Sequence, residues 1–250
     1  MAEYSHDKIV PFTDSKHTKK QQVATMFDQI AFRYDFLNRF LSGGVDIYWR
    51  KRALRELKGL NPSIILDVAT GTGDVAIMAY KYLQPEKIIG IDISEGMLEI
   101  GRKKVAKLLL NKQIELFQGD SEAINFTDNT FDAVTVAFGV RNFENLEKGL
   151  SEMLRVLKPG GKLVVLEFSR PKKPAFKSLY NFYMKAVAPR AGKWLSKNKE
   201  AYQYLHSSVK AFPEGETFLH ILQQVGFTET NLKSLSLGIC TIYCGRKKVY

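Results

Sequence analysis

A short apolar run that leads into a pair of glycines constrains the fold of this chain more than any other feature. Residues Ile64–Val68 have the composition of a buried strand, and an apolar-periodic helix is predicted to begin near Asp74. Gly71 and Gly73 lie in the turn between them. Glycine is favoured there because the chain must turn sharply and because a ligand can lie directly against bare backbone. The stretch therefore predicts a strand–turn–helix unit that binds a nucleotide-like ligand.

Two classes of ligand suit this turn. Its glycines, followed by Ala76, fit the G-x-G-x-x-G/A dinucleotide pattern, and Asp92 lies about 20 residues further on, where a ribose-binding acid belongs. However, Asp74 would repel a pyrophosphate at the helix N-terminus. S-adenosylmethionine carries a sulfonium cation and an ammonium group but no phosphate, so a ring of carboxylates favours it. These carboxylates are Asp67, Asp74, Asp92 and Asp120. A helix cap is the alternative role of Asp74.

The composition is that of a globular enzyme. Of the 250 residues, 45% are apolar and 25% are charged, which is ordinary for a protein with a sizeable core. No apolar run approaches the roughly 18 residues of a membrane span, and the polar N-terminus lacks the apolar core of a secretory signal. Cys240 and Cys244 have no clustered histidines or further cysteines near them, so neither a metal site nor a disulfide framework is predicted. We therefore expect a cytoplasmic enzyme without a metal.

The net charge of +11 is concentrated in residues 170–212. This segment holds ten Lys or Arg residues against one acid, Glu200, and aromatic side chains are interleaved with them. Such a segment suits nucleic acid, an anionic membrane surface or an anionic substrate. A solvated basic face that keeps the protein soluble is the alternative.

Residues 19–250 are predicted to form a single domain, preceded by a flexible N-terminus at residues 1–18. Residues 19–60 are predicted to form two helices that pad the nucleotide-binding part or cover its open side. Further strands are predicted at Lys87–Ile93, Ile114–Gly119, Phe131–Phe138, Lys162–Phe168, Asn231–Ser236 and Cys240–Arg246. Further helices are predicted at Ser94–Leu110, from Asn142 or Asn145 to Leu157, and at Gly215–Val225. Lys158–Gly161 is predicted to be a tight turn.

This alternation predicts an α/β fold with a doubly wound, mostly parallel sheet. The last two strands are joined by a short connection and must be antiparallel. A seven-stranded, mostly parallel sheet with a C-terminal antiparallel hairpin and helices on both faces resembles the Rossmann-like class I methyltransferases. Dinucleotide dehydrogenases do not usually end in such a hairpin.

Ligands of a doubly wound sheet bind at the carboxyl ends of its strands, which here carry polar side chains. The glycine turn would hold the methionine part of S-adenosylmethionine, with Thr72 at its amino-acid end. Asp92 would accept hydrogen bonds from the ribose hydroxyls, and Asp120 with Ser121 would meet the adenine edge. The candidate donor-binding residues are Asp67, Gly71, Thr72, Gly73, Asp92, Asp120 and Ser121. Helix caps are the alternative role for the strand-end acids.

Arg141 and Asn142 follow the strand Phe131–Phe138 and indicate the methyl acceptor. The Asp/Asn-Pro-Pro-aromatic sequence of adenine-N6 methyltransferases and the Pro-Cys of cytosine-C5 enzymes are both absent at this point. The basic charge of the chain therefore does not indicate a nucleic-acid base as acceptor. An arginine here suits stabilising a phenolate or orienting a water, and a structural salt bridge is the alternative.

Three segments carry a specific resemblance. Tyr34–Ser42, running on to Trp49, and Arg155–Ser169 resemble the two signatures of the ubiquinone/menaquinone biosynthesis C-methyltransferase family, and Phe138–Asn142 fits between them. The similarity extends over roughly residues 20–247. The first signature departs from the family at two positions, where Leu37 replaces the usual Met and Asp46 the usual His. The second departure argues against a catalytic role for position 46.

The resemblance implies transfer of a methyl group from S-adenosylmethionine to a ring carbon of a polyprenylated quinol. Conversion of demethylmenaquinol to menaquinol is favoured, and a polyprenyl methoxy-benzoquinol of ubiquinone synthesis is the alternative. Arg141 would then stabilise the quinol oxyanion while Asn142 orients the ring, and Asp120 or Tyr34 would assist proton removal.

Because such an acceptor lives in the bilayer, the basic and aromatic residues 170–212 are predicted to be a substrate lid at an anionic membrane surface. We expect peripheral association with the inner face of the cell membrane, no nucleic-acid partner, and a homodimer as a candidate assembly. From other classes, an NAD-dependent oxidoreductase and a nucleic-acid-binding module are the alternatives.

Overall fold

The structure, a computed structural model, describes residues 4–171 and 199–249 of the chain. The strands are β1 (Ile64–Val68), β2 (Lys87–Asp92), β3 (Ile114–Gln118), β4 (Phe131–Ala137), β5 (Leu157–Phe168), β6 (Thr228–Leu235) and β7 (Cys240–Arg246). The helices are α1 (Lys19–Ser42), α2 (Val45–Arg55), α3 (Asp74–Leu83), α4 (Glu95–Lys107), α5 (Leu146–Val156), α7 (Lys199–Ala211) and α8 (Glu216–Val225), with 3-10 turns η1 (Val140–Asn142) and η2 (Ser236–Gly238). No helix within the described ranges is long and apolar enough to cross a membrane.

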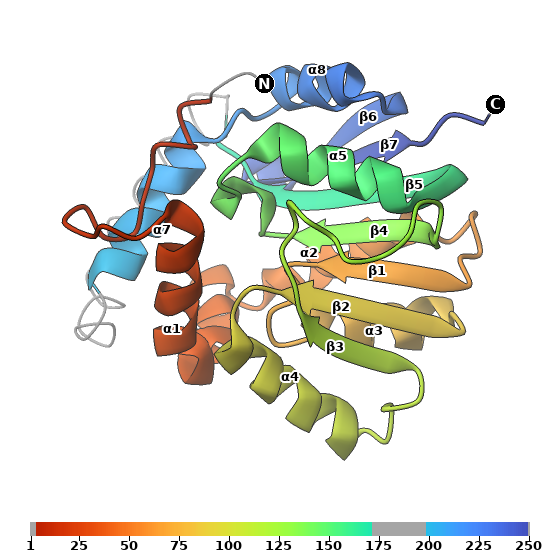
Figure 1. Cartoon of the computed structure of the whole chain (residues 1–250), viewed down its shortest axis with the longest axis horizontal. Helices are drawn as coiled ribbons and strands as arrows, with labels where there is room; N and C mark the ends of the chain where they lie inside the picture. The colour runs from red at the N-terminus through yellow and green to blue at the C-terminus, as the bar shows by residue number, and fades with distance from the viewer. Residues whose placement is uncertain (1–3, 172–198, 250) are drawn as a thin grey trace.

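The strands form one sheet in the order β3-β2-β1-β4-β5-β7-β6 (Figure 1). Strands β1 to β5 run parallel, and β7 is antiparallel to both β5 and β6. The predicted α/β fold, with its mostly parallel sheet and C-terminal antiparallel hairpin, is therefore confirmed. Because β1 lies between β2 and β4, the chain leaves it first toward one edge of the sheet and later toward the other. This reversal opens a crevice at the carboxyl ends of these strands.

The sheet is buried on both faces, which explains the nearly continuous apolar runs of its central strands. Leu66 and Val68 of β1 pack into one core layer with residues of α5 and α8. Ile65, which points the other way, packs into a second layer with residues of α2, α3 and α4. Each central strand therefore contributes side chains to two cores, and the carboxyl ends of the strands remain as the place where polar groups gather.

The second signature folds differently from its predicted turn-then-strand pattern. Strand β5 begins at Leu157, which pairs with Phe131, and the next paired residue is Lys162, opposite Ala133. The residues predicted as a tight turn therefore form a bulge at the start of β5. Glycine is required here, since a Cβ on Gly161 would lie 2.8 Å from the carbonyl oxygen of Lys158.

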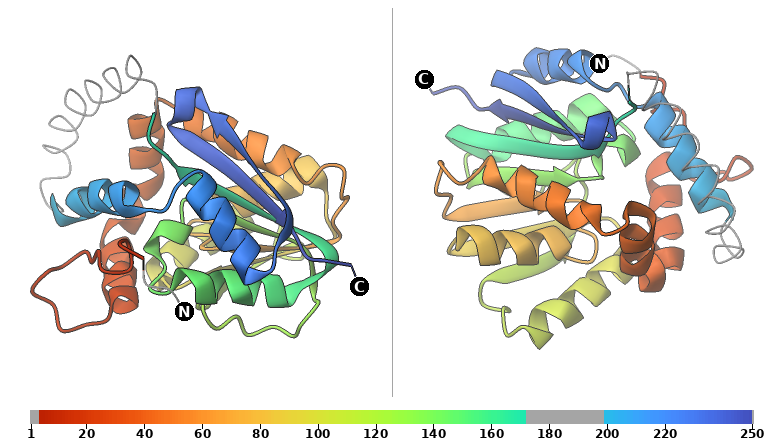
Figure 2. Two further views of the ribbon diagram at one scale, coloured as in Figure 1. Left: turned by 90° about the horizontal axis from the view of Figure 1, so that it is seen from above. Right: turned by 180° about the vertical axis from the view of Figure 1, so that it is seen from behind.

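Helix α7 was not expected from the sequence, which predicted residues 170–212 only as a lid. In the structure, α7 packs against α1, where Ala201 and Tyr204 bury their side chains with Val23 and Met26 (Figure 2). The rest of the predicted lid, residues 172–198, lies outside the described residues. The apolar residues of α1 thus contact α7 and also line the pocket at the end of the sheet.

Residues 4–18, predicted as a flexible segment, make several contacts with the body of the protein. The Tyr4 hydroxyl donates to Glu147 of α5 at 2.7 Å, and the Lys19 ammonium donates to the carbonyl oxygen of His6 at 2.7 Å. The His6 side chain is fully buried. These contacts connect the N-terminal segment to the start of α1 and to α5.

Helix α4 approaches the glycine turn closely because residue 101 has no side chain. A Cβ built on Gly101 would lie 2.7 Å from Leu116 Cδ1 and 3.1 Å from the backbone carbonyl carbon of Thr72. The second contact is with the turn itself, which cannot move aside as a flexible side chain would. Gly101 therefore fixes how closely α4 packs behind the turn.

We predict that Gly101→Ala lowers the free energy of unfolding by about 1–3 kcal/mol, because the added methyl group overpacks this contact. An alanine in an unhindered helix would instead be stabilising. Urea unfolding followed by circular dichroism measures the change. Gly59→Ala is the matched control, since nothing lies within 4 Å of its Cβ position. We expect the control to change stability by less than about 0.5 kcal/mol, and a stabilising Gly101→Ala would contradict this packing.

Candidate active site

The glycine turn between β1 and α3 is tied to β2. The amide of Gly71 donates to Asp92 Oδ2 at 2.8 Å, and the amide of Thr70 donates to the carbonyl oxygen of Ile91 at 3.0 Å. Gly71 and Gly73 have φ angles of 57° and 75°, in the left-handed region that glycine adopts without strain. The turn therefore has the shape that the two glycines predicted.

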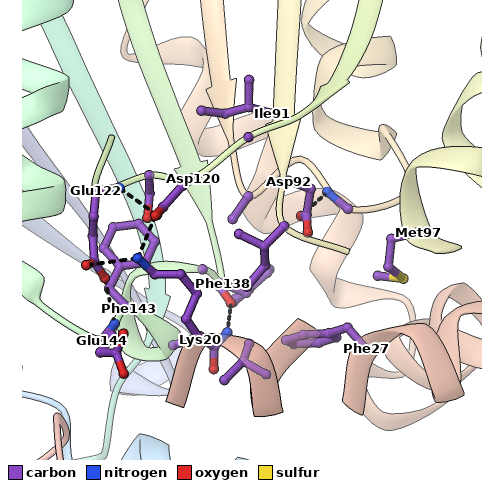
Figure 3. Close-up of a pocket in the computed structure, with 18 of the residues that line it drawn as sticks. Lys20, Phe27, Ile91, Asp92, Met97, Asp120, Glu122, Phe138, Phe143 and Glu144 are labelled. Carbon is purple, nitrogen blue, oxygen red and sulfur yellow. Dashed lines mark hydrogen bonds and ion pairs between the residues drawn. The ribbon is translucent and has the colours of Figure 1, made fainter. Parts of the chain in front are cut away.

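A pocket opens at the carboxyl ends of the parallel strands (Figure 3). Gly71, Asp92, Asp120 and Ser121 line it, as the sequence predicted for donor-binding residues. Apolar side chains complete the walls, chiefly Phe27, Ile91, Met97, Phe138 and Phe143. The pocket thus combines bare backbone, carboxylates and apolar surface, a combination suited to a nucleoside that carries a cation.

Helix α1 covers this pocket on the side away from the sheet, as Figure 3 shows for Lys20 and Phe27. Tyr34 also lines the pocket, and its ring meets that of Phe27 edge to face at a centroid distance of 5.9 Å. The sequence left open whether the front helices pad the fold or cover it, and the structure shows that α1 covers the pocket.

Asp92 is the pocket carboxylate that is hydrogen-bonded to the glycine turn. Its Oδ1 accepts from the Ser94 amide at 2.9 Å, while Oδ2 accepts from Gly71. Burial raises the pKa of Asp92 to about 6, although these amide hydrogen bonds act in the opposite direction. Each oxygen retains further acceptor capacity, so Asp92 can still receive the two hydroxyls of a ribose.

Asp67 lies beneath the turn and does not line the pocket. Its two oxygens accept from the hydroxyls of Thr70 and Thr135, both at 2.6 Å. Burial raises the pKa of Asp67 to about 6, against the effect of these hydrogen bonds and of the positive charge of Arg50. The structure therefore places Asp67 as a support for the turn rather than in the predicted ring around the ligand.

Thr72 is also buried and does not line the pocket. Its hydroxyl donates to Asp35 of α1 at 2.7 Å and accepts from Lys104 of α4 at 2.9 Å. The structure thus places the Thr72 side chain in a link between α1, the turn and α4. This connection could not be read from the sequence, since its three members come from the turn and from two helices that are distant in the chain.

Asp74 does not contribute negative charge to the pocket as the carboxylate pattern suggested. It accepts 2.8 Å hydrogen bonds from Arg39 and Arg50 and one of 2.7 Å from Lys104. Burial alone would raise the pKa of Asp74, but these three cations lower it below its usual value. Asp46, which replaces the usual His of the family signature, is buried in the same network through Arg39 and Ser42. Position 46 thus lies outside the pocket.

Asp120 meets a cation that the sequence reasoning missed. Lys20 of α1 contacts Asp120 at 2.5 Å and Glu122 at 3.2 Å, and all three side chains line the pocket (Figure 3). In the sequence, Lys20 is only a polar residue at the start of the amphipathic helix, and nothing in the pattern indicates its partner. Lys20 therefore closes one end of α1 onto the loop that follows β3.

Asn142 lines the pocket, whereas Arg141, its neighbour in η1, is buried beside it. Arg141 Nη1 donates to Glu167 of β5 at 2.8 Å and to the carbonyl oxygen of Phe138 at 2.5 Å. The guanidinium also lies 5.4 Å from the centre of the Phe168 ring. The salt bridge that the sequence left as an alternative is thus present, and it holds the arginine next to the pocket.

The described residues contain no cluster of three or more His, Cys, Asp or Glu side chains that could hold a metal ion. The pocket residues instead fit an organic cation with a sugar: a carboxylate for the ribose, exposed backbone at Gly71 and the apolar side chain of Met97. Asn142 lines the same pocket, next in the chain to the buried Arg141.

Comparisons with known proteins agree with this geometry. The protein from Bacteroides fragilis named demethylmenaquinone methyltransferase is 50% identical over 98% of this chain and 99% of its own length. A Porphyromonas gingivalis protein of the same name is 44% identical over 97% and 99%. A Geobacter sulfurreducens protein named ubiquinone/menaquinone biosynthesis C-methyltransferase UbiE is 47% identical over 92% and 90%.

Solved structures support the fold. A putative S-adenosylmethionine-dependent methyltransferase from Methanococcus maripaludis matches with a TM-score of 0.60 at 20% identity, covering 96% of this chain and 98% of its own. A Thermotoga maritima methyltransferase matches with a TM-score of 0.61 at 20% identity, covering 90% and 99%. The model of the ubiE/COQ5 methyltransferase family matches residues 15–247. The chain thus belongs to the ubiE/COQ5 methyltransferase family and is an S-adenosylmethionine-dependent enzyme of quinone biosynthesis.

Proposed function

We propose that this enzyme transfers a methyl group from S-adenosylmethionine to a ring carbon of demethylmenaquinol, giving menaquinol. The observation that carries the proposal is the 50% identity, over nearly the full length of both chains, to a protein named demethylmenaquinone methyltransferase. A polyprenyl methoxy-benzoquinol is the second candidate acceptor, because the Geobacter sulfurreducens relative is named for both quinones.

The donor would occupy the pocket under α1. Asp92 would accept hydrogen bonds from the ribose hydroxyls, Asp120 and Ser121 would meet the adenine, and the exposed backbone at Gly71 would lie along the methionine part. When bound, S-adenosylmethionine supplies an electrophilic methyl group on a sulfonium. The protein's contribution is to position the donor and acceptor in line and to exclude water with the apolar residues of α1.

The acceptor would lie between this pocket and η1. A quinol carbon becomes nucleophilic when the neighbouring hydroxyl loses its proton, and Arg141 can stabilise the resulting oxyanion. Asn142, which lines the pocket, would orient the ring. Asp120 and Tyr34 also line the pocket and are the candidate groups to assist proton removal.

The acceptor also requires access to a bilayer, and we propose peripheral association with the inner face of the cell membrane. On α1, Phe32 is 93% exposed and Phe40 is 51% exposed, and on α2 Tyr48 is 51% exposed. Large apolar side chains exposed together are typical of an interaction surface. The basic residues of 170–212 would add attraction to anionic lipids. A homodimer is a further candidate assembly, which sedimentation equilibrium would test.

We predict that the purified enzyme transfers labelled methyl from S-adenosylmethionine to a reduced, prenylated demethylnaphthoquinol. The product, separated by chromatography, should carry one added methyl on the ring. A methoxy-benzoquinol with the same prenyl chain measures the alternative acceptor in parallel. Absence of labelled product with both quinols, from an enzyme that binds S-adenosylhomocysteine, would contradict the proposed function.

We predict that Asp92→Asn weakens S-adenosylmethionine binding about 10- to 100-fold, because the ribose loses a charged hydrogen-bond acceptor. In the wild type, affinity should fall as the pH drops below about 6, where Asp92 takes up a proton. Calorimetric titration between pH 5 and 8 measures both effects. An affinity of the variant equal to that of the wild type would remove Asp92 from the donor site.

The raised pKa of Asp92 also predicts how the stability of the protein depends on pH. The folded pKa of Asp92 is raised, so this carboxyl stabilises the fold below its ordinary pKa of 3.8, and that stability is lost as the pH rises to about 6. Through this carboxyl, the melting temperature of the ligand-free wild type should therefore fall as the pH rises from about 3.8 to about 6, and Asp92→Asn should remove that fall. Asp132→Asn is the matched control, because nearby Lys158 and two amides lower the pKa of Asp132 despite its partial burial. The control should destabilise the protein at pH 7 and leave donor affinity unchanged.

We predict that the enzyme floats with vesicles of phosphatidylglycerol and phosphatidylcholine at low salt and less so at high salt. Replacing both Phe32 and Phe40 by Ser should reduce the bound fraction several-fold, because two exposed apolar anchors are lost. Leu109→Ser is the control, since this side chain is 86% exposed just beyond the far end of α4. Equal flotation of the control and the double variant would rule out α1 as the membrane-binding surface.

A further inference from the structure

Three buried polar atoms next to the pocket have no hydrogen-bond partner in the part of the chain that the structure describes. They are Arg141 Nε, Asn142 Oδ1 and Tyr204 Oη. Arg141 is 5% exposed and Tyr204 is 4% exposed, so both side chains are shielded from bulk solvent. Buried polar groups are paired in nearly all native structures, and those that are not call for an explanation such as a ligand.

The first two of these atoms belong to neighbouring residues of η1. Arg141 Nη1 and Asn142 Nδ2 both donate to the carbonyl oxygen of Phe138, at 2.5 and 3.5 Å. This shared acceptor orients both side chains. It leaves the Nε–H of Arg141 as a free donor, because Glu167 accepts from Nη1 and from the Arg141 backbone amide and not from Nε. It leaves Oδ1 of Asn142 as a free acceptor.

Tyr204 reaches the same place from α7, which packs against η1. Its ring lies in the apolar cluster with Val23 and Met26 of α1, and Val23 lines the pocket. Its hydroxyl is close enough to the Arg141–Glu167 ion pair for both charges to act on its pKa, in opposite directions. The phenol therefore stands between α1, α7 and η1, at the side of the pocket where Asn142 lies.

Two donors and one acceptor suit the oxygen of a quinol. The hydroxyl beside the reacting carbon becomes an oxyanion, which needs two donors, and before ionisation its proton needs an acceptor. Burial raises the pKa of Tyr204 well above its usual value, so its hydroxyl keeps its proton and serves as a donor. The free Nε–H of Arg141 is the second donor, and Asn142 Oδ1 is the acceptor.

We propose that Tyr204 binds the acceptor: its hydroxyl donates to the oxygen beside the reacting ring carbon, together with Arg141 Nε, while Asn142 Oδ1 accepts from the neutral hydroxyl. This inference rests on the proposed function and adds a residue to its acceptor site. The quinol hydroxyl first gives its proton to a base in the pocket. The ring electron pair then forms the bond to the methyl carbon, and the carbon–sulfur pair stays on sulfur. The ring hydrogen leaves as a proton, which restores the aromatic ring as a quinolate, and the quinolate oxygen takes back a proton from the base to give the quinol.

Tyr204→Phe tests this assignment. We expect kcat/KM for the quinol to fall about 10- to 100-fold, with the affinity for S-adenosylhomocysteine unchanged. Because the variant only removes a buried hydroxyl that has no partner, its melting temperature should stay the same or rise. The rise of kcat/KM with pH should also move upward by about one unit, since the oxyanion loses a donor. A purely structural role would not move this pH profile.

Tyr243→Phe is the matched control. Tyr243 is fully buried, but its hydroxyl accepts from the Gly215 amide at 2.8 Å. Its removal leaves that amide unpaired, so we expect a lower melting temperature with kcat/KM close to wild type at 20 °C or below. Tyr204→Phe should therefore lower kcat/KM and not the melting temperature, whereas Tyr243→Phe should lower the melting temperature and not kcat/KM.

Either of two results for Tyr204→Phe would overturn the inference and leave the proposed function standing. One is kcat/KM equal to wild type on a quinol that the wild type methylates. The other is a loss of melting temperature like that of Tyr243→Phe with no shift of the pH profile. If the wild type methylates no quinol at all, the proposed function fails and the inference fails with it.

Discussion

The hydrogen bond between the Gly71 amide and the Asp92 carboxylate is the contact on which the rest of the site depends. It joins the ends of β1 and β2 at the point where the chain reverses direction across the sheet. Asp92 is buried where it makes this hydrogen bond, and burial destabilises its charged form and so raises its pKa. Asp67 supports the same turn from below, and burial raises its pKa in the same way. The geometry of the turn is thus held by two buried carboxylates, and their burial favours the protonated form over the charged one.

Helix α1 is attached to this turn by charge and not by apolar contact alone. Asp35 bonds to Thr72, and Arg39 bonds to Asp74, so the helix covering the pocket is fixed to the turn that forms it. Lys20 makes a similar connection at the other end of the helix through Asp120. A substitution in α1 can therefore alter donor binding without touching the donor. The first family signature begins in this helix and runs on into α2, so it includes residues that hold the turn.

The acceptor side of the site follows a different principle. Arg141 is held by Glu167 and by the carbonyl oxygen of Phe138, which leaves one of its donors free. Such an arrangement costs stability in the ligand-free enzyme and yields a preorganised donor for a developing negative charge. The salt bridge and the catalytic role, which the sequence offered as alternatives for Arg141, are compatible, since the ion pair fixes the position of the guanidinium.

The sequence alone determined the features that depend on neighbouring residues. The apolar period and the paired glycines predicted the sheet, the turn at Gly71 and the strand-end position of Asp92, because these are local properties of the chain. The bulge at the start of β5 escaped prediction, since it depends on backbone contacts between Gly161 and residues of β4 and the chain end.

Only the tertiary structure decided which groups meet. Asp74 appeared in the sequence as a free carboxylate, but α1, α2 and α4 bring three cations to it. Tyr204 appeared as one aromatic residue among many in a basic segment, and only the packing of α7 against η1 places it beside Arg141. A sequence pattern specifies the period and polarity of an element, whereas the partner of a buried charge or hydroxyl depends on how distant elements pack. That is why Gly71, Asp92, Asp120 and Ser121 could be predicted at the strand ends that line the pocket, whereas the partners of Asp74 and the position of Tyr204 could not.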